Sequence, residues 1–236
     1  MVFFQLDLAR FIAIYIGLGA IFFFNFCIVY KILQRQKNRL NLSLCGFYTS
    51  ISCGLLFNFI YAPITIPETV KILNLLSNFF VFLSPVFLTV YTLILEKSEK
   101  GIATYKLLIF IIIYGILLSY IFLNPSNVKI DASTDWIPVW SIFYSIYLTT
   151  VSSVIGIIPA LILSIMIYKR IKIEEIKNRW RYFLIGLCGC IILFYCFIIS
   201  NTLNNAALRL IISLISISLL LWGYLMYYGV GRHIST

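Results

Sequence analysis

The chain has 236 residues, of which 62% are hydrophobic and 11% are charged, with a formal net charge of +10. A soluble domain is about half apolar and about a quarter charged, because its surface needs polar cover. The composition therefore excludes a soluble enzyme and a free nucleic-acid-binding protein, and it predicts an integral membrane protein.

Seven apolar runs are each long enough to cross a bilayer core of about 30 Å, which takes roughly 20 residues of helix. In chain order these spans are residues 11–33, 42–62, 72–95, 107–123, 140–168, 182–200 and 210–228. No cleavable signal pattern precedes the first span, so we expect it to remain as a helix. The predicted fold is all-α, a single bundle of seven transmembrane helices over residues 1–236.

The fifth span is longer than a bilayer requires. At roughly 29 residues it reaches about 43 Å as a helix, so it must tilt, kink or project from the membrane. Gly156 and Pro159 provide a kink site, because proline removes a backbone donor and crowds the preceding turn. Pro85 predicts a second kink, in the third span.

The basic residues fall mainly in alternate loops. Fourteen of the 18 lie on one side of the predicted membrane: four after the first span, three after the third, six after the fifth and one after the seventh. They are Lys31, Arg35, Lys37, Arg39, Lys97, Lys100, Lys106, Lys169, Arg170, Lys172, Lys177, Arg179, Arg181 and Arg232. The other side holds Arg10, Lys71, Lys129 and Arg209. Since cytoplasmic loops carry an excess of Lys and Arg, we expect a multi-pass protein of the cell membrane with its N-terminus outside and its C-terminus in the cytoplasm.

The net positive charge is then mainly a cytoplasmic rim beside anionic lipid, so the expected partner is the lipid bilayer and not a nucleic acid. The six bases after the fifth span are also candidates for docking a separate cytoplasmic protein. They are Lys169, Arg170, Lys172, Lys177, Arg179 and Arg181. The alternative is an ordinary solvated helix extension, because Glu174 and Glu175 lie in the same connector.

The groups that membrane enzymes and pumps use are missing from the spans. No carboxylate lies in the middle of a span, the last span has no lysine for a retinal Schiff base, and the one histidine is His233 in the tail. The sequence also lacks an H-E-x-x-H zinc motif and a glycine-rich phosphate loop. We therefore expect neither an enzyme nor a bound metal or cofactor, and the six cysteines, all inside apolar runs, are expected to pack between helices.

Uncharged polar residues gather toward the outer ends of the spans and suggest a ligand pocket closed by aromatic rings. The candidate residues are Asn58, Asn74, Asn78, Trp136, Trp140, Asn201, Asn205 and Arg209. Asn74 and Asn78 are four residues apart and so share a helix face. A pocket of this kind suits a small neutral or anionic ligand. The alternative is that these residues are helix caps, an interfacial aromatic belt and hydrogen bonds between helices.

Three segments resemble a known family. They are Trp136-Ile-Pro-Val-Trp140 before the long fifth span, Arg179-Trp-Arg-Tyr-Phe-Leu-Ile-Gly186, and the closing run from Trp222 to Val230. Together they are similar to the N-terminal seven-helix sensor modules of prokaryotic histidine kinases. The resemblance implies an extracytoplasmic or intramembrane sensor whose last helix joins signalling domains. Because the sequence ends a few residues after the seventh span, we expect a separate partner protein in place of an attached kinase domain.

The leading expectation is a receptor-like sensory module that binds a small ligand or senses the membrane and signals by helix rearrangement. One alternative is a small carrier or channel subunit for a neutral or lipid-like solute, which requires polar groups leading in from both faces. The inner half of the spans offers few such groups, among them Asn25, Thr49 and Ser50. Another alternative is a structural subunit of a membrane complex. The sequence does not specify a ligand or an oligomeric state.

Overall fold

The structure is a computed structural model that describes residues 8–34, 37–97 and 101–231. Of these residues, seven helical segments are long and apolar enough to cross a membrane, which confirms the predicted number of spans and the architecture of a multi-pass membrane protein. They are Ile12–Leu33, Arg39–Tyr61, Pro67–Lys97, Thr104–Leu123, Ile142–Arg170, Glu174–Leu203 and Ala206–Val230. The predicted residues Arg35, Lys100, Arg232 and His233 lie outside the described ranges.

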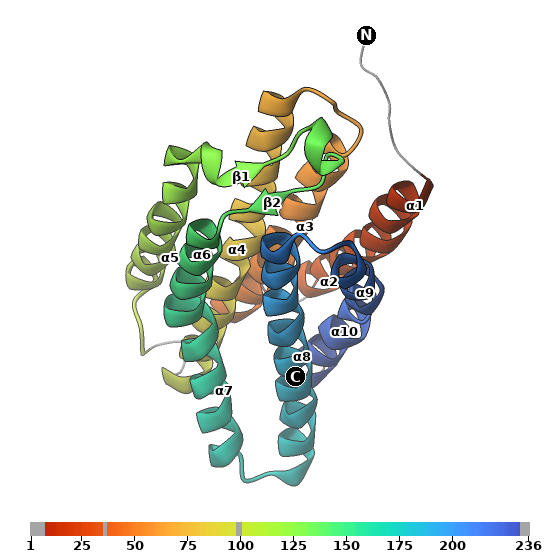
Figure 1. Cartoon of the computed structure of the whole chain (residues 1–236). Coiled ribbons are helices and arrows are strands. Elements are labelled where there is room, and N and C mark those ends of the chain that lie inside the picture. The colour runs from red at the N-terminus through yellow and green to blue at the C-terminus, as the bar shows by residue number, and fades with distance from the viewer. Residues whose placement is uncertain (1–7, 35–36, 98–100, 232–236) are drawn as a thin grey trace.

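Several of the seven segments are built from more than one regular element (Figure 1). In chain order the principal elements are α1 (Leu8–Phe11), the π-helix η1 (Ile12–Leu18), α2 (Gly19–Leu33), α3 (Arg39–Tyr61), α4 (Pro67–Lys97), α5 (Thr104–Ser119), β1 (Val128–Lys129), β2 (Val139–Trp140), α6 (Ile142–Val151), the π-helix η5 (Ser152–Ile157), α7 (Ile158–Arg170), α8 (Glu174–Leu203), α9 (Ala206–Ser216) and α10 (Leu219–Gly231). Short 3₁₀ turns, η2 (Tyr120–Leu123), η3 (Pro125–Asn127) and η4 (Ala132–Thr134), connect α5 to the two strands.

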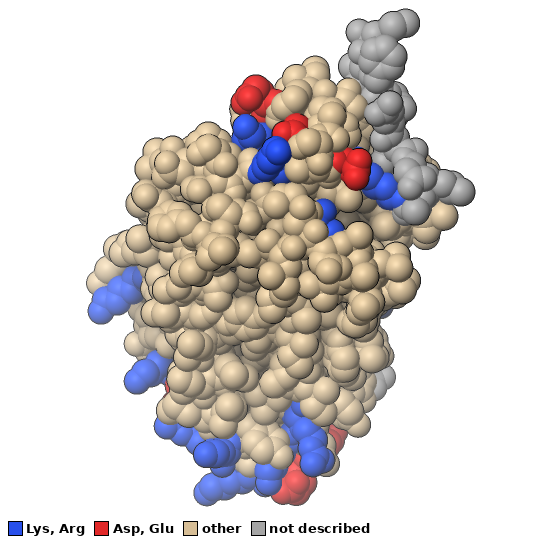
Figure 2. Space-filling model, in the orientation of Figure 1, with Lys and Arg blue, Asp and Glu red and all other residues tan. Residues whose placement is uncertain are grey.

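The bundle has two chemically different ends. At one end the strands β1 and β2 form a short antiparallel hairpin in which Val128 pairs with Trp140; we call this the hairpin end (Figure 1). At the opposite end α7 is joined to α8 through residues 171–173, and we call this the basic end. Figure 2 shows Lys and Arg side chains gathered at the basic end with fewer acidic ones among them, and charges of both signs around the hairpin.

Helix α4 is the centre of the bundle. In the 18-residue apolar stretch of its span 61% of the residues are buried, against 17% in the first span and 11% in the last. Two apolar clusters pack along it: one around Tyr48, Tyr91 and Phe183 toward the basic end, and one around Phe82 and Trp140 toward the hairpin end. Helix α4 continues through Pro85 without an interruption in its bounds. The first and last spans therefore lie at the periphery, where few of their side chains are buried inside the protein.

The fifth span is irregular at the position that the sequence predicts. Between α6 and α7 the chain forms the π-helix η5, which contains Gly156 and ends two residues before Pro159. A Cβ atom on Gly156 would lie 2.7 Å from Cβ of Pro85, so only glycine allows α4 to approach this closely. The Thr89 hydroxyl donates to the Gly156 carbonyl at 2.6 Å. The irregular segment is thus held directly against the central helix.

The seventh span is divided, which the sequence analysis did not predict. Helix α9 ends at Ser216 and α10 begins at Leu219. At the break, Nε1 of Trp222 donates to the Ser218 hydroxyl at 3.0 Å. Serine hydroxyls that bond nearby groups offer the backbone an alternative to a continuous helix. Helix α10 then packs against α8.

Candidate functional site

Asn58 of α3 and the buried Asn74 and Asn78 of α4 meet in one polar network at the hairpin half of the bundle. The Tyr61 hydroxyl accepts hydrogen bonds from Nδ2 of Asn58 at 3.1 Å and from Nδ2 of Asn74 at 3.0 Å. Nδ2 of Asn78 donates to Oδ1 of Asn74 and to the Tyr144 hydroxyl, both at 3.1 Å. We call these five residues the Asn–Tyr network; they join α3, α4 and α6.

The helical spacing of the residues explains why they meet. Asn58 and Tyr61 are one turn apart on α3, and Asn74 and Asn78 are one turn apart on α4, so each pair shares a helix face. Asn74 and Asn78 are each 2% exposed. An asparagine amide in hydrocarbon is costly without a partner, and hydrogen bonds between helices remove that cost. The network therefore fixes how the three helices pack at this level.

Trp140 covers the network from the end of strand β2. Its ring lies 5.1 Å from the Tyr144 ring, 5.5 Å from Phe197 and 6.0 Å from Phe82, measured between centroids. Among the described residues, Nε1 of Trp140 and Oδ1 of Asn58 are buried without a hydrogen-bond partner. A buried polar atom without a partner normally has a functional or structural explanation.

Four of the predicted pocket residues lie outside the network. Asn201 donates to the Phe197 carbonyl of its own helix at 3.1 Å, and Asn205 caps α9 by accepting from the Leu208 backbone N–H at 3.1 Å. Arg209 donates to the Pro138 carbonyl at 2.9 Å, and the Trp136 carbonyl accepts from Arg10 at 2.9 Å. The structure thus brings together Asn58, Asn74 and Asn78 beneath Trp140, whereas the other four residues make contacts of their own.

Tyr61 and Tyr144 are the members that sequence reasoning missed. Both lie in apolar runs where a tyrosine is indistinguishable from a core aromatic residue. The available signal was the hydroxyl itself, because a buried tyrosine usually finds a hydrogen-bond partner. Tyr61 is also three residues after Asn58, the spacing that places two side chains on one helix face.

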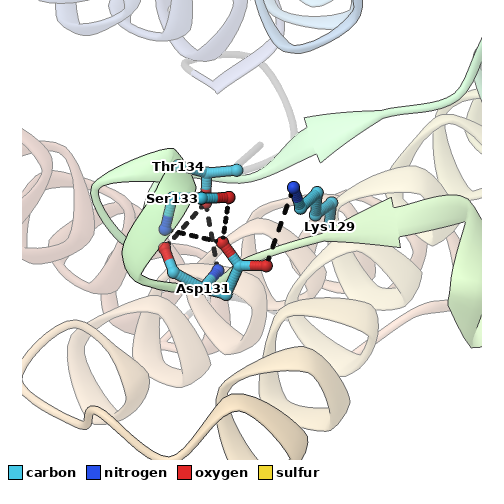
Figure 3. A network of polar contacts seen from close by, with 4 residues as sticks. All are labelled: Lys129, Asp131, Ser133 and Thr134. Atoms are coloured by element: carbon cyan, nitrogen blue, oxygen red, sulfur yellow. Dashed lines mark hydrogen bonds and ion pairs between the residues drawn. The ribbon is translucent and has the colours of Figure 1, made fainter.

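The loop between the strands is organised by Asp131 (Figure 3). Its carboxylate accepts from the Ser133 hydroxyl at 2.6 Å and from the Ser133 backbone N–H at 2.8 Å, and Lys129 lies 3.9 Å away. These bonds, that of the Ser133 hydroxyl foremost, hold the pKa of Asp131 below its ordinary value. Arg10 ties the N-terminal segment to the same loop, and burial lowers the pKa of its guanidinium. This end of the molecule is therefore an ordered surface.

The predicted docking residues all lie at the basic end. Most of them lie within α7 and α8, because only residues 171–173 separate the two helices. Lys169 and Arg170 end α7, Lys172 lies in the three-residue link, and Lys177, Arg179 and Arg181 lie in the first turns of α8. Arg170 pairs with Glu96 at the end of α4. Lys177 pairs with Glu174 at 3.1 Å and Arg179 pairs with Glu175 at 2.6 Å. Two of the four bases on α8 and its link thus have carboxylate partners within one helical turn.

A groove of about 300 Å³ runs along the outside of the bundle between α6 and α8. Nine residues form its walls. Three of them, Ile142, Ile146 and Leu203, are apolar and lie near the hairpin end, and six others line the rest. The six are Ser145, Thr149 and Thr150 of α6, and Ile198, Ile199 and Thr202 of α8. The Ser145 and Thr202 hydroxyls share a hydrogen bond of 2.5 Å between the two helices.

Comparison with known proteins assigns no family to this fold. No protein-family model matches the chain, and no curated protein matches it at a significant level.

Proposed function

We propose that the chain is a receptor-like sensory module of the cell membrane, with its hairpin end outside and its basic end in the cytoplasm. One observation carries this proposal. The single helical segment Ile142–Arg170 joins the Asn–Tyr network at one end of the bundle to the basic end at the other, and a π-helix interrupts it midway. A segment of this kind suits the transmission of a packing change across the membrane.

The contacts of η5 support a hinge that several helices control. The Tyr114 hydroxyl of α5 donates to the Ser152 hydroxyl at 3.4 Å, and Ser153 shares a hydrogen bond of 2.7 Å with Tyr195 of α8. Together with Thr89 of α4, these residues surround the irregular turn. A π-helical turn has an extra residue and a weaker hydrogen-bond pattern, and such turns are frequent at functional sites.

Two contacts connect α7 to its neighbours α4 and α8 at the basic end, which the proposal places in the cytoplasm. Arg170 at its end pairs with Glu96, whose side chain is 8% exposed. Nε1 of Trp180 in α8 donates to the Ser164 carbonyl of α7 at 2.8 Å. A displacement of α7 therefore changes its contacts with both α4 and α8. The six basic residues from Lys169 to Arg181 lie on α7, the link and the start of α8, so the surface that they form changes with it. A separate signalling protein is the proposed reader of this surface.

The basic half of the bundle favours sensing over transport. The buried hydroxyls of Ser43, Thr92 and Ser164 donate to carbonyls of their own helices at 2.6–3.0 Å, one turn earlier in the chain. Hydroxyls used in this way do not form a path for a solute. A carrier needs polar groups leading in from both faces, whereas the Asn–Tyr network lies in one half only.

The charge distribution supports the proposed orientation. The loops at the basic end belong to the set with fourteen Lys and Arg residues, and those at the hairpin end belong to the set with four. Cytoplasmic loops carry such an excess, so the basic end faces inward.

The proposal is tested by spin labels at the basic end. In a cysteine-free variant in nanodiscs, labels on Lys106→Cys and Lys172→Cys report the distance between α5 and the α7–α8 link by pulsed electron paramagnetic resonance. Asn78→Leu breaks two bonds of the Asn–Tyr network, and we expect it to shift or broaden the distance distribution. Asn205→Ala removes a helix cap at the same end of the bundle and is expected to leave the distribution unchanged. A folded Asn78→Leu protein with the wild-type distribution would indicate a static scaffold.

A further inference from the structure

The groove between α6 and α8 opens sideways, toward the space that lipid occupies around a transmembrane bundle. The side chains at its hairpin-end mouth are among the most exposed of the chain: Ile142 is 70% exposed, Ile146 60% and Leu203 63%. In a membrane such side chains contact acyl chains. At about 300 Å³ the groove lies at the lower limit of volumes typical of ligand sites.

The floor of the groove is polar but already hydrogen-bonded. The Ser145 hydroxyl lies 3.1 Å from the Ser141 carbonyl oxygen, and the Thr202 hydroxyl lies 2.8 Å from the Ile198 carbonyl oxygen. Because each hydroxyl has one proton, one of the two donates to the other across the 2.5 Å contact and the other donates to the carbonyl of its own helix. These residues therefore keep α6 and α8 close together without requiring a polar ligand. Their methyl and methylene groups, with the isoleucines beside them, present an apolar channel that suits a hydrocarbon chain.

Arg209 adds a positive charge at the hairpin end of this channel. Its guanidinium donates to the Pro138 carbonyl at 2.9 Å and to the Ser200 carbonyl at 3.4 Å. Pro138 lies four residues before Ile142, and Ser200 lies two residues before Thr202, so the guanidinium bridges the two segments that form the groove walls. In the described part of the chain no carboxylate pairs with Arg209, in contrast to Arg170 and Arg179 at the basic end.

We propose that this groove is a binding site for an anionic phospholipid, with the headgroup phosphate on Arg209 and one acyl chain between α6 and α8. Guanidinium and phosphate form short, charge-assisted hydrogen bonds in a matching planar geometry. An arginine at the start of a span lies at the depth of the headgroups, where such a bond forms. The site does not depend on the sensory role, since it uses neither the Asn–Tyr network nor the docking residues.

The experiment measures which phospholipids the purified full-length chain retains. The protein is exchanged into mixed vesicles of phosphatidylglycerol and phosphatidylcholine, extracted, and examined by native mass spectrometry at increasing collision energy. We expect one phosphatidylglycerol to remain after phosphatidylcholine is lost. Arg209→Gln removes the charge and is expected to reduce the retained fraction about tenfold, the effect of losing one charge-assisted hydrogen bond. Thr149→Phe fills the channel and is expected to reduce the retained fraction as well, because it excludes the acyl chain.

Matched variants separate this site from general charge effects. Lys129→Gln removes a base at the same end but away from the groove and should retain lipid as the wild type does, while Arg209→Lys should retain an intermediate fraction. Millimolar inorganic phosphate should not displace the lipid, because the acyl chain contributes to binding. Equal retention by Arg209→Gln, Thr149→Phe and wild type, with unchanged melting temperatures, would overturn the proposal. So would displacement by free phosphate, or occupation of the groove by a helix of a co-purified protein.

Discussion

Tyr61 serves as the shared acceptor of the Asn–Tyr network, so its hydroxyl supports two amides at once. Tyr61→Phe leaves Nδ2 of Asn58 and of Asn74 without that partner, and each unsatisfied buried donor costs about 1–3 kcal/mol. We expect a clear loss of thermal stability in detergent. Tyr15→Phe is the matched control, because the Tyr15 hydroxyl makes a single bond to the Phe59 carbonyl at 3.1 Å. A Tyr61→Phe protein no less stable than Tyr15→Phe would show that the network contributes little.

Asp131 makes the hairpin loop sensitive to acid. Its folded-state pKa is below the ordinary value, so its contribution to loop stability is present at neutral pH and is lost as the pH falls through that lowered pKa. Ser133→Ala removes the largest cause and is expected to move the pKa upward, which the pH dependence of the residue 133 backbone amide resonance measures by NMR. Ser126→Ala, at an exposed position in the same connection, should leave the titration in place.

At the scale of single residues, the sequence was enough to predict the asparagines of the polar cluster but not which side chains bond to them. Asn58, Asn74 and Asn78 were recognisable because an amide within an apolar span needs a hydrogen bond. Tyr144 was not, since its hydroxyl does not interrupt an apolar pattern, and the side chains that approach each other from α4 and α6 are 66 residues apart. The capping role of Asn205 was among the alternatives, and it depends on where α9 begins.

Helices α8 and α10 meet along a seam of glycines. A Cβ atom on Gly186 would lie 2.5 Å from the Trp222 carbonyl oxygen, one on Gly189 would lie 2.3 Å from the Trp222 ring, and one on Gly229 would lie 2.6 Å from the Phe183 backbone nitrogen. Small residues of this kind let helix backbones approach closely in a membrane, where packing replaces the hydrophobic effect. We call Gly186, Gly189 and Gly229 the glycine seam.

The glycine seam predicts opposite signs for two similar substitutions. Gly186→Ala forces α10 away from α8, and overpacking of this kind costs about 1–3 kcal/mol. Gly115→Ala, in α5, meets nothing within 4 Å and gains about 1 kcal/mol of helix propensity. We expect the melting temperature to fall for Gly186→Ala and to stay level or rise for Gly115→Ala. Equal changes in the two variants would contradict close packing at the seam.

The helix ends illustrate what hydropathy cannot specify. The sixth span was predicted to begin at residue 182, but α8 begins at Glu174, because a helix continues beyond the apolar run when its charged residues pair with each other one turn apart. Gly156 and Pro159 predict a kink in the fifth span, which gives the place of the irregularity but not its form as the π-helix η5. The division of the seventh span at Ile217 and Ser218 was not, since serines are common in continuous membrane helices.

The two ends of the molecule differ in their content of Lys and Arg, and the orientation proposed from this difference is testable in cells. All six cysteines lie in described residues and none forms a disulfide. They can therefore be replaced to give a cysteine-free background without breaking a disulfide. A cysteine at Ser133, in the hairpin loop, is expected to react with a membrane-impermeant maleimide added outside intact cells. A cysteine at Ile173, in the α7–α8 link, should react only after permeabilisation. Labelling of Ile173→Cys from outside would reverse the orientation.

The glycine seam also has a consequence for how the chain is made. While the ribosome is still extending the chain, α8 is in the membrane before α10 exists, and its seam face is a strip of bare backbone with no side chains to fill it. Until α10 is made, other membrane helices with small residues can approach that strip as closely as α10 does in the finished protein. We therefore expect the synthesis of α10 to be the step at which this face of the nascent protein is covered.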